Sequence, residues 1–360
     1  MTWRRRSLWI GGGLLLAVAL VVPGSSLYYR ATNGAGCAAA CHEMRDPYNV
    51  WRESTHRSVA CTSCHGEPMT SGPAFEMANA RRLFRHVRDE LPEQIRMKGL
   101  DVAAMMERCR DCHRQEFADW NAGPHGSTFT TIFLDAKHNR ATRLRDDCFR
   151  CHGSYYEGGI GQLVAPVDTK GPWRMVDAEW ARQPAMPCLA CHQMHRRGEP
   201  LKSETTPRPH PALGQELQRP SVALFDRRTM MHIPASDLPV PAMLDGARLV
   251  RMSPDRRQAL CYECHAPLPT RQVASGDDRT GIGVHEGISC LACHEKHGQK
   301  TRASCATCHP RLSNCGLDVE KMDTTFASAA SKHNIHFVKC ADCHTKGVPP
   351  RRASLVAQIP

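Results

Sequence analysis

The chain has 360 residues, of which 23% are charged and 6% aromatic, and it carries 19 cysteines, 20 histidines and a formal net charge of +11. The 41% hydrophobic share counts those cysteines, so side chains alone would form only a modest apolar core, while the ordinary charge content argues against wholesale disorder. The absence of glycine periodicity, of sustained heptads and of a second long apolar run excludes a collagen, a coiled coil and a polytopic membrane protein.

The first 30 residues combine an arginine cluster with an apolar stretch. Arg4 to Arg6 precede a run from Leu8 to Tyr29 that is about long enough to span a bilayer, and the arginines would hold its start on the cytoplasmic side. We expect residues 1–30 to form a single N-terminal transmembrane anchor in the inner (cytoplasmic) membrane, with the rest of the chain in the periplasm. Removal as a signal peptide is the alternative, because Gly24 to Ser26 are small enough for cleavage.

Beyond this stretch, hydrophobic periodicity predicts few long elements. Apolar residues at three- and four-residue steps predict helical turns over 101–108 and 254–260, and residues 74–88 form the clearest amphipathic helix. The sequence gives little evidence for strands.

Eighteen of the cysteines occur in pairs, and a histidine directly follows every pair. Random placement of these residues would give roughly 0.06 C-x-x-C-H motifs. Zinc clusters and disulfides are alternatives, but neither requires a histidine after each second cysteine. Eight motifs have this spacing, and the first along the chain has three residues between its cysteines. Numbered one to nine in chain order, the motifs are Cys37/Cys41/His42, Cys61/Cys64/His65, Cys109/Cys112/His113, Cys148/Cys151/His152, Cys188/Cys191/His192, Cys261/Cys264/His265, Cys290/Cys293/His294, Cys305/Cys308/His309 and Cys340/Cys343/His344.

This spacing is the signature of covalent haem c attachment. The two thiols bond to the two vinyl groups of one haem, and the adjacent histidine becomes the proximal ligand of its iron. We therefore predict nine covalently bound haems, which supply the missing apolar core of a mainly α fold with much irregular structure, organised around stacked haems. Their propionates bring the net charge to about +2 when oxidised and about −7 when reduced, so the basic sequence does not indicate a nucleic-acid partner.

The motif spacing also predicts the domain organisation. Residues 31–200 hold motifs one to five, residues 201–254 form a proline-rich connection, and residues 255–360 form a C-terminal domain with motifs six to nine. Within these domains, CLACHQMH at 188–195 is echoed by CLACHEKH at 290–297, a weak sign of duplication.

Eleven histidines lie outside the motifs, and nine irons with two histidines each would need nine of them. His195 and His297 each follow a proximal histidine by three residues, which suits ligation of a neighbouring stacked haem. The odd cysteine, Cys315, is best read as a structural thiol. The candidate distal ligands are His56, His125, His138, His195, His232, His285, His297, His333 and His336, with His86 and His210 ranked behind them.

An apolar N-terminal stretch followed by CAAACHEM at 37–44, WRESTHRSVACTSCH at 51–65 and ERCRDCH at 107–113 resembles the NapC/NirT family of membrane-anchored tetrahaem quinol dehydrogenases, over about residues 1–155. The resemblance implies that the first haem lies at the membrane surface beside the quinol, with Met44 as an axial ligand.

Two features depart from that family. The first motif is longer by one residue, and no lysine in residues 66–97 matches the family's quinol-site lysine. The nearest cations are Arg81, Arg82 and Arg85, and the candidate proton acceptors are Asp89 and Glu43.

Taken together, the sequence predicts an electron-transfer protein that takes electrons from membrane quinol and passes them to a periplasmic redox protein or terminal reductase. One alternative is a multihaem reductase of a small inorganic substrate, although the C-x-x-C-K motif of nitrite-type reductases is absent. The other is a tethered cytochrome subunit of a larger respiratory or photosynthetic complex.

Overall fold

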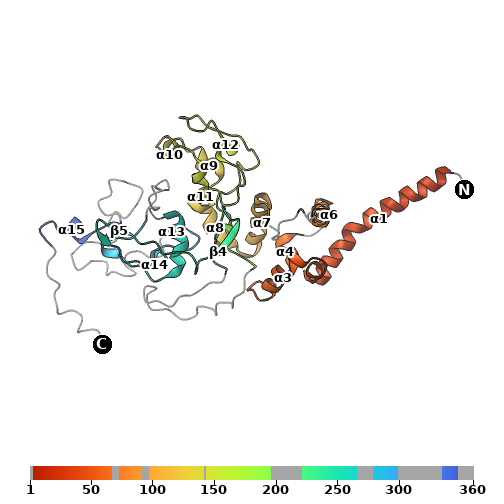
Figure 1. Cartoon of the computed structure of the whole chain (residues 1–360), viewed down its shortest axis with the longest axis horizontal. Helices are drawn as coiled ribbons and strands as arrows, with labels where there is room; N and C mark the ends of the chain where they lie inside the picture. Colours follow the sequence, from red (N-terminus) through yellow and green to blue (C-terminus); the bar gives the residue numbers. More distant parts are fainter. Residues whose placement is uncertain are drawn as a thin grey trace.

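The computed structural model describes residues 3–66, 73–88, 90, 97–141, 143–195, 221–265, 279–298 and 335–347. This part of the chain is mainly helical with much irregular structure, as predicted (Figure 1). The eighth motif and several candidate residues lie outside the described residues: Cys305, Cys308, His309, Cys315, His210, His333 and Asp89.

The N-terminal part consists of helices separated by short turns. The helices predicted over 74–88 and 101–108 are confirmed as α6 and α7. In chain order the elements are α1 (Trp3–Thr32), α2 (Ala35–Ala40), α3 (Arg45–Arg52), α4 (Cys61–His65), α6 (Pro73–Val87), α7 (Gly99–Cys112) and α8 (Arg114–Ala122).

Helix α1 projects from one end of the chain, and α6 packs against the end where α1 stops (Figure 1). The Asn79 side chain donates a hydrogen bond to the Tyr29 hydroxyl at 3.3 Å, and the Phe75 ring lies 5.4 Å from the Tyr29 ring. Among the described residues, no helix is long and apolar enough to cross a membrane, so the predicted transmembrane anchor is not found there.

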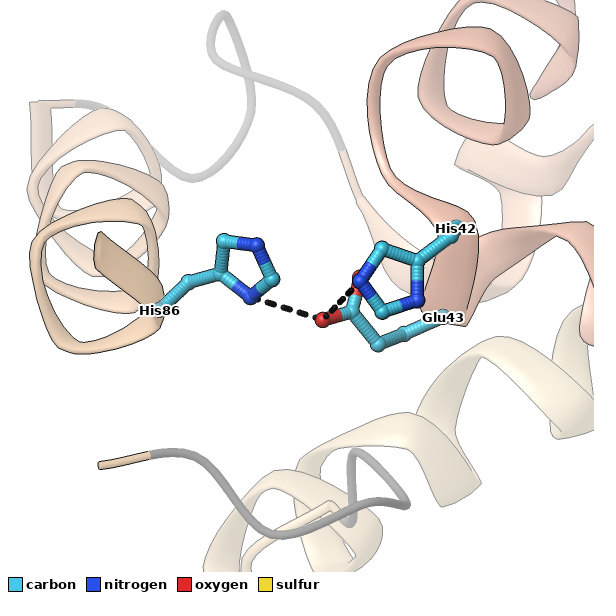
Figure 2. Close-up of side chains that lie close together, drawn as sticks. All are labelled: His42, Glu43 and His86. Carbon is cyan, nitrogen blue, oxygen red and sulfur yellow. Dashed lines mark ion pairs between the residues drawn. The ribbon is translucent and has the colours of Figure 1, made fainter. Parts of the chain in front are cut away.

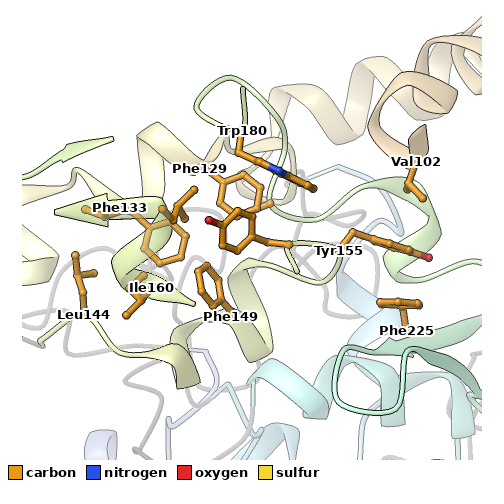
Figure 3. Packing of buried hydrophobic residues seen from close by; sticks show 13 residues of the cluster. Val102, Phe129, Phe133, Leu144, Phe149, Tyr155, Ile160, Trp180 and Phe225 are labelled. Atoms are coloured by element: carbon orange, nitrogen blue, oxygen red, sulfur yellow. The ribbon is translucent and has the colours of Figure 1, made fainter. Parts of the chain in front are cut away.

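The main aromatic cluster is built largely from residues 128–180 (Figure 3). Helix α9 (Phe129–Phe133) begins after Thr128, whose side chain accepts a hydrogen bond from the Thr131 amide. It contributes Phe129 and Phe133, each 1% exposed. The cluster is completed by α11 (Phe149–His152), α12 (Ile160–Leu163) and the side chains of Phe149, Tyr155, Tyr156, Ile160, Leu163, Trp180 and Phe225; the short α10 (Ala136–Ala141) follows α9.

In the described part of the chain, three short antiparallel hairpins are present, although the sequence shows little evidence for strands. The longest pairs β3 (Ala223–Asp226) with β4 (Met231–Pro234), in the register Phe225 to His232. It lies within the predicted proline-rich connection, of which the structure describes residues 221–254. The other two pair β1 (Val164–Ala165) with β2 (Arg174–Met175) and β5 (Leu244–Asp245) with β6 (Arg248–Leu249).

The C-terminal part holds α13 (Ala259–His265), α14 (Cys290–Cys293) and α15 (Cys340–Cys343). A buried polar network joins the segment before α13 to the start of α14. The Ser289 hydroxyl, which caps α14, donates to Asp255 at 2.7 Å, and the Arg257 guanidinium donates to both Asp255 oxygens at 2.8 Å. This network positions motif seven against motif six.

The aromatic cluster gives a first prediction. Phe133→Ala should lower the free energy of unfolding by about 3–5 kcal/mol, because Phe133 is fully packed and its removal leaves a cavity. Phe84→Ala, on a residue that is 61% exposed, is the matched control and should change it by less than about 0.5 kcal/mol. Chemical denaturation of the holoprotein measures both, and equal effects of the two substitutions would contradict the assigned core.

The Asp255 network gives a second prediction, on pH. Burial alone would raise the pKa of Asp255, but the hydrogen bonds from Arg257 and Ser289 outweigh it and lower the pKa. The ionised carboxylate therefore stabilises the fold above the pKa of an unfolded aspartate, about 3.9, and this contribution is lost as the pH falls through the lower folded value.

Asp255→Asn should consequently destabilise the protein at pH 7, by about 1–3 kcal/mol. The difference from wild type should shrink as the pH falls below the unfolded value of about 3.9 and through the lower pKa of the folded carboxyl, where wild type also loses the charge. Unfolding curves at pH 7 and pH 3 measure it. A difference that does not change between the two pH values would show that the charge of Asp255 is unimportant.

Candidate haem-binding sites

A helical turn carries each motif in the described part of the chain. Residues three apart lie on the same side of a helix, so the two thiols of a C-x-x-C-H motif face one haem. The amide of the motif histidine donates to the carbonyl of the first cysteine, at 2.8 Å for His113 and 2.9 Å for both His294 and His344. This bond places each histidine directly beyond its two cysteines.

The longer first motif keeps the same arrangement. Cys37 lies in α2, and the amide of Cys41 donates to its carbonyl at 2.9 Å. Residues four apart also share one side of a helix, so the extra residue still leaves both thiols facing the same way.

The structure brings histidines together in pairs. Six His–His ring contacts are described, and each joins one motif histidine to one histidine from outside the motifs. The ring centroids lie 5.3 Å apart in His42/His86, 6.1 Å in His113/His56, 5.8 Å in His65/His195, 6.1 Å in His265/His125, 6.0 Å in His192/His297 and 6.0 Å in His294/His336.

These separations fit haem iron held between two imidazoles. Metal–nitrogen bonds of about 2 Å on opposite faces of one iron place the ring centroids about 6 Å apart. Simple contacts between rings cover a similar range, but they would not select one motif histidine and one other histidine in every pair. The residues present therefore fit a covalently attached haem with two axial histidines.

Burial keeps several of these imidazoles neutral, which is the form that binds a metal. Burial, followed by the nearby His195 and Arg108, lowers the pKa of His65 to about 4. Burial also lowers the pKa of His195 and of His294. The ring pairs thus lie in surroundings that favour ligation over protonation.

A histidine that ranked behind the other distal candidates lies opposite the first motif (Figure 2). His86, on α6, faces His42, and Glu43 lies between them, 2.7 Å from His86 Nδ1 and 3.4 Å from His42 Nε2. Met44, the predicted axial ligand, ends the 3₁₀ turn His42–Met44 and is partly buried. The sequence ranked His86 among the weakest distal candidates, together with His210.

Three further candidates lie elsewhere. His232, on β4, directs Nε2 at the Leu189 carbonyl at 2.8 Å, and its ring lies 5.3 Å from Phe225. His285 has Nδ1 3.2 Å from the Ile335 carbonyl, beside motif nine. His138 is exposed on α10. Because His232 contacts the Leu189 carbonyl, it supports the motif-five loop.

Thiols of different motifs also meet. Hydrogen-bond contacts join Cys109 to Cys188, Cys151 to Cys264, and Cys261 to Cys290. The contact between Cys109 and Cys188 raises the pKa of Cys109 and lowers the pKa of Cys188. Because each thiol attaches to the edge of its haem, contacting thiols place motif three beside motif five, motif four beside motif six, and motif six beside motif seven.

Comparisons with known proteins agree with this chemistry. Residues 32–203 match the family described as outer membrane cytochrome MtrC/MtrF-like, domains II/IV, and residues 250–310 match cytochrome c7 and related cytochrome c. No curated protein and no solved structure gives a significant match. The matches do not support the resemblance to NapC/NirT specifically. Both matched families consist of cytochromes with several covalently bound haems, and the chain is accordingly a multihaem c-type cytochrome that functions in electron transfer.

Proposed function

We propose that this protein carries electrons from a quinol at the inner membrane, through nine haems, to a redox protein in the periplasm. Haem iron, when bound, supplies reversible one-electron transfer. The observation that carries the proposal is the pairing of motif histidines with histidines from outside the motifs. Two protein ligands leave an iron no position for a substrate, which suits conduction over catalysis.

The order of the motifs in space supports conduction. The Cys61 amide donates to Asn33 Oδ1 at 2.9 Å, next to motif one, and Arg108 beside motif three donates to the Cys64 carbonyl at 2.6 Å, so motifs one, two and three follow one another. The thiol contacts then extend this order to motifs five, six and seven, with motif four beside six. A row of neighbouring haems gives electrons a route from one end of the chain toward the other.

The donor end of the proposal lies at α6. Met77, Ala80, Arg81, Phe84 and Arg85 line a shallow, open apolar hollow on the surface of this helix. An apolar surface with two cations suits a quinol head group, whose developing anion a guanidinium can stabilise by hydrogen bonding.

Proton release has an acceptor close to this hollow. Quinol oxidation releases two protons with two electrons, and the Glu43 carboxylate lies 2.7 Å from His86 of the same helix. The contacts of α6 with Tyr29 keep the hollow beside the end of α1, whose start carries the arginine cluster. We propose that these two helices hold the protein at the membrane, with the haem-binding parts in the periplasm.

A second candidate is electron transfer at the outer membrane. The match of residues 32–203 to outer membrane cytochrome domains favours it. In that case the donor is another redox protein, and reduction by quinol is absent.

The ligand pairing predicts how the reduced protein binds carbon monoxide. No more than about two haems should bind it readily after dithionite reduction, because two histidines occupy the axial positions of most irons. Optical titration counts the binding haems, and low-temperature EPR of the oxidised protein counts low-spin and high-spin irons. Binding at more than about two haems would favour the reductase alternative.

The α6 hollow predicts the site of quinol oxidation. Arg81→Ala should slow reduction by a quinol analogue by about tenfold or more, because a hydrogen bond from a charged group contributes about 1.5–3 kcal/mol. Reduction by dithionite should be unchanged. Stopped-flow absorbance measures both rates.

Arg82→Ala is the matched control for that experiment, since Arg82 lies on the same helix, donates to Asn79 at 3.4 Å and does not line the hollow. It should leave the quinol rate within about twofold of wild type. Equal rates of reduction by quinol in Arg81→Ala and Arg82→Ala would show that quinol does not bind at this hollow. That result would favour the outer membrane candidate or the tethered subunit.

A further inference from the structure

Two of the six histidine pairs connect the N-terminal group of motifs with the C-terminal group. His265 of motif six faces His125, which lies between motifs three and four. His192 of motif five faces His297, which follows motif seven. Each of these pairs therefore takes one imidazole from either side of the segment predicted to connect two separate domains.

The turn that presents His125 is held in place by residues next to motif five. The buried Trp120 donates from its indole nitrogen to the Met186 carbonyl at 3.2 Å. His125 itself lies in the 3₁₀ turn Pro124–Gly126, where a side chain at Gly126 would come within 2.8 Å of the Trp120 carbonyl. The position of His125 is thus defined by packing.

Independent contacts bring the two groups together at the same place. Arg150 of α11 forms an ion pair with Glu263 of α13 at 3.8 Å, and Cys151 contacts Cys264 in the same two helices. Cys191 of motif five also lies near Cys261 and Cys264 of motif six. Motifs four, five and six therefore meet around α11 and α13.

We propose that His125 is the distal ligand of the motif-six haem and His297 the distal ligand of the motif-five haem, so that the two motif groups exchange axial ligands. The ring separations of 6.1 Å and 6.0 Å match the other four pairs and the spacing that one iron requires. The inference rests on haem binding and is independent of the electron donor and acceptor proposed above.

The exchange makes the two groups of motifs a single unit. Each of these irons is six-coordinate only when both parts of the chain are in place, because its two ligands come from different sides of the connection. It also fixes haems five and six beside each other, at the point where electrons must pass from the N-terminal group to the C-terminal group.

A double-substitution experiment on the full chain tests this assignment. The number of haems that bind carbon monoxide after reduction is measured for His125→Ala, for His265→Ala and for the two combined. Each single variant should gain one carbon monoxide-binding haem. The combination should also gain one, because both histidines serve the same iron; a gain of two would overturn the proposal.

The other pair and a crossed pair complete the design. His297→Ala with His192→Ala should likewise gain one haem, whereas His125→Ala with His297→Ala should gain two, because these residues serve different irons. Intact mass spectrometry gives the number of covalent haems in each variant. A carbon monoxide count that is unchanged in His125→Ala would show that its ring contact with His265 is packing alone.

The design also holds if a proximal substitution prevents haem attachment. If the His265→Ala variant lacks the motif-six haem, its mass is lower by one haem. Adding His125→Ala should then produce no additional haem that binds carbon monoxide. An additional carbon monoxide-binding haem in the double variant would show that His125 serves another haem, which would overturn the proposal.

Discussion

The pairing of a motif histidine with a histidine from outside the motifs is the constraint on which the rest of this structure depends. Of the described pairs, His294/His336 joins residues of the same part of the chain, whereas His65/His195 and His192/His297 join distant ones. Short helices linked by irregular segments suit this requirement, because each helix needs to present only one motif. The small amount of regular secondary structure thus follows from the ligand geometry.

The side chains provide a conventional core in only part of the molecule. Phe129, Phe133 and Phe149 pack with Trp180 in the region of residues 128–180 (Figure 3), and Cys148 of motif four packs against this cluster. A smaller cluster forms around Met243, Val250 and Tyr262. The aromatic cluster gives motifs four and five a rigid support, while apolar burial at the other motifs depends on the haems themselves.

Polar contacts then position individual motifs. The hairpin of β3 and β4 pairs with the motif-five loop through the Ala223 amide and the Cys191 carbonyl, and His232 reaches the Leu189 carbonyl of the same loop. Asp255 acts similarly for motif seven through Ser289. In both places the residues that hold a motif come from segments that carry no cysteine, so these segments are part of the haem-binding structure.

Haem attachment and proximal ligation could be predicted from the sequence because they are local: two cysteines and a histidine within one helical turn need no other part of the chain. The helices α6 and α7 were predictable for the same reason, from their periodicity. The hairpins were not, because strands of two to four residues show no alternation that can be distinguished from irregular chain. The choice of His86 opposite His42, the different position of His232, and the meeting of motifs four, five and six were decided only by the tertiary structure. Each depends on how residues far apart in the chain approach one another, and spacing along the sequence carries no record of that approach.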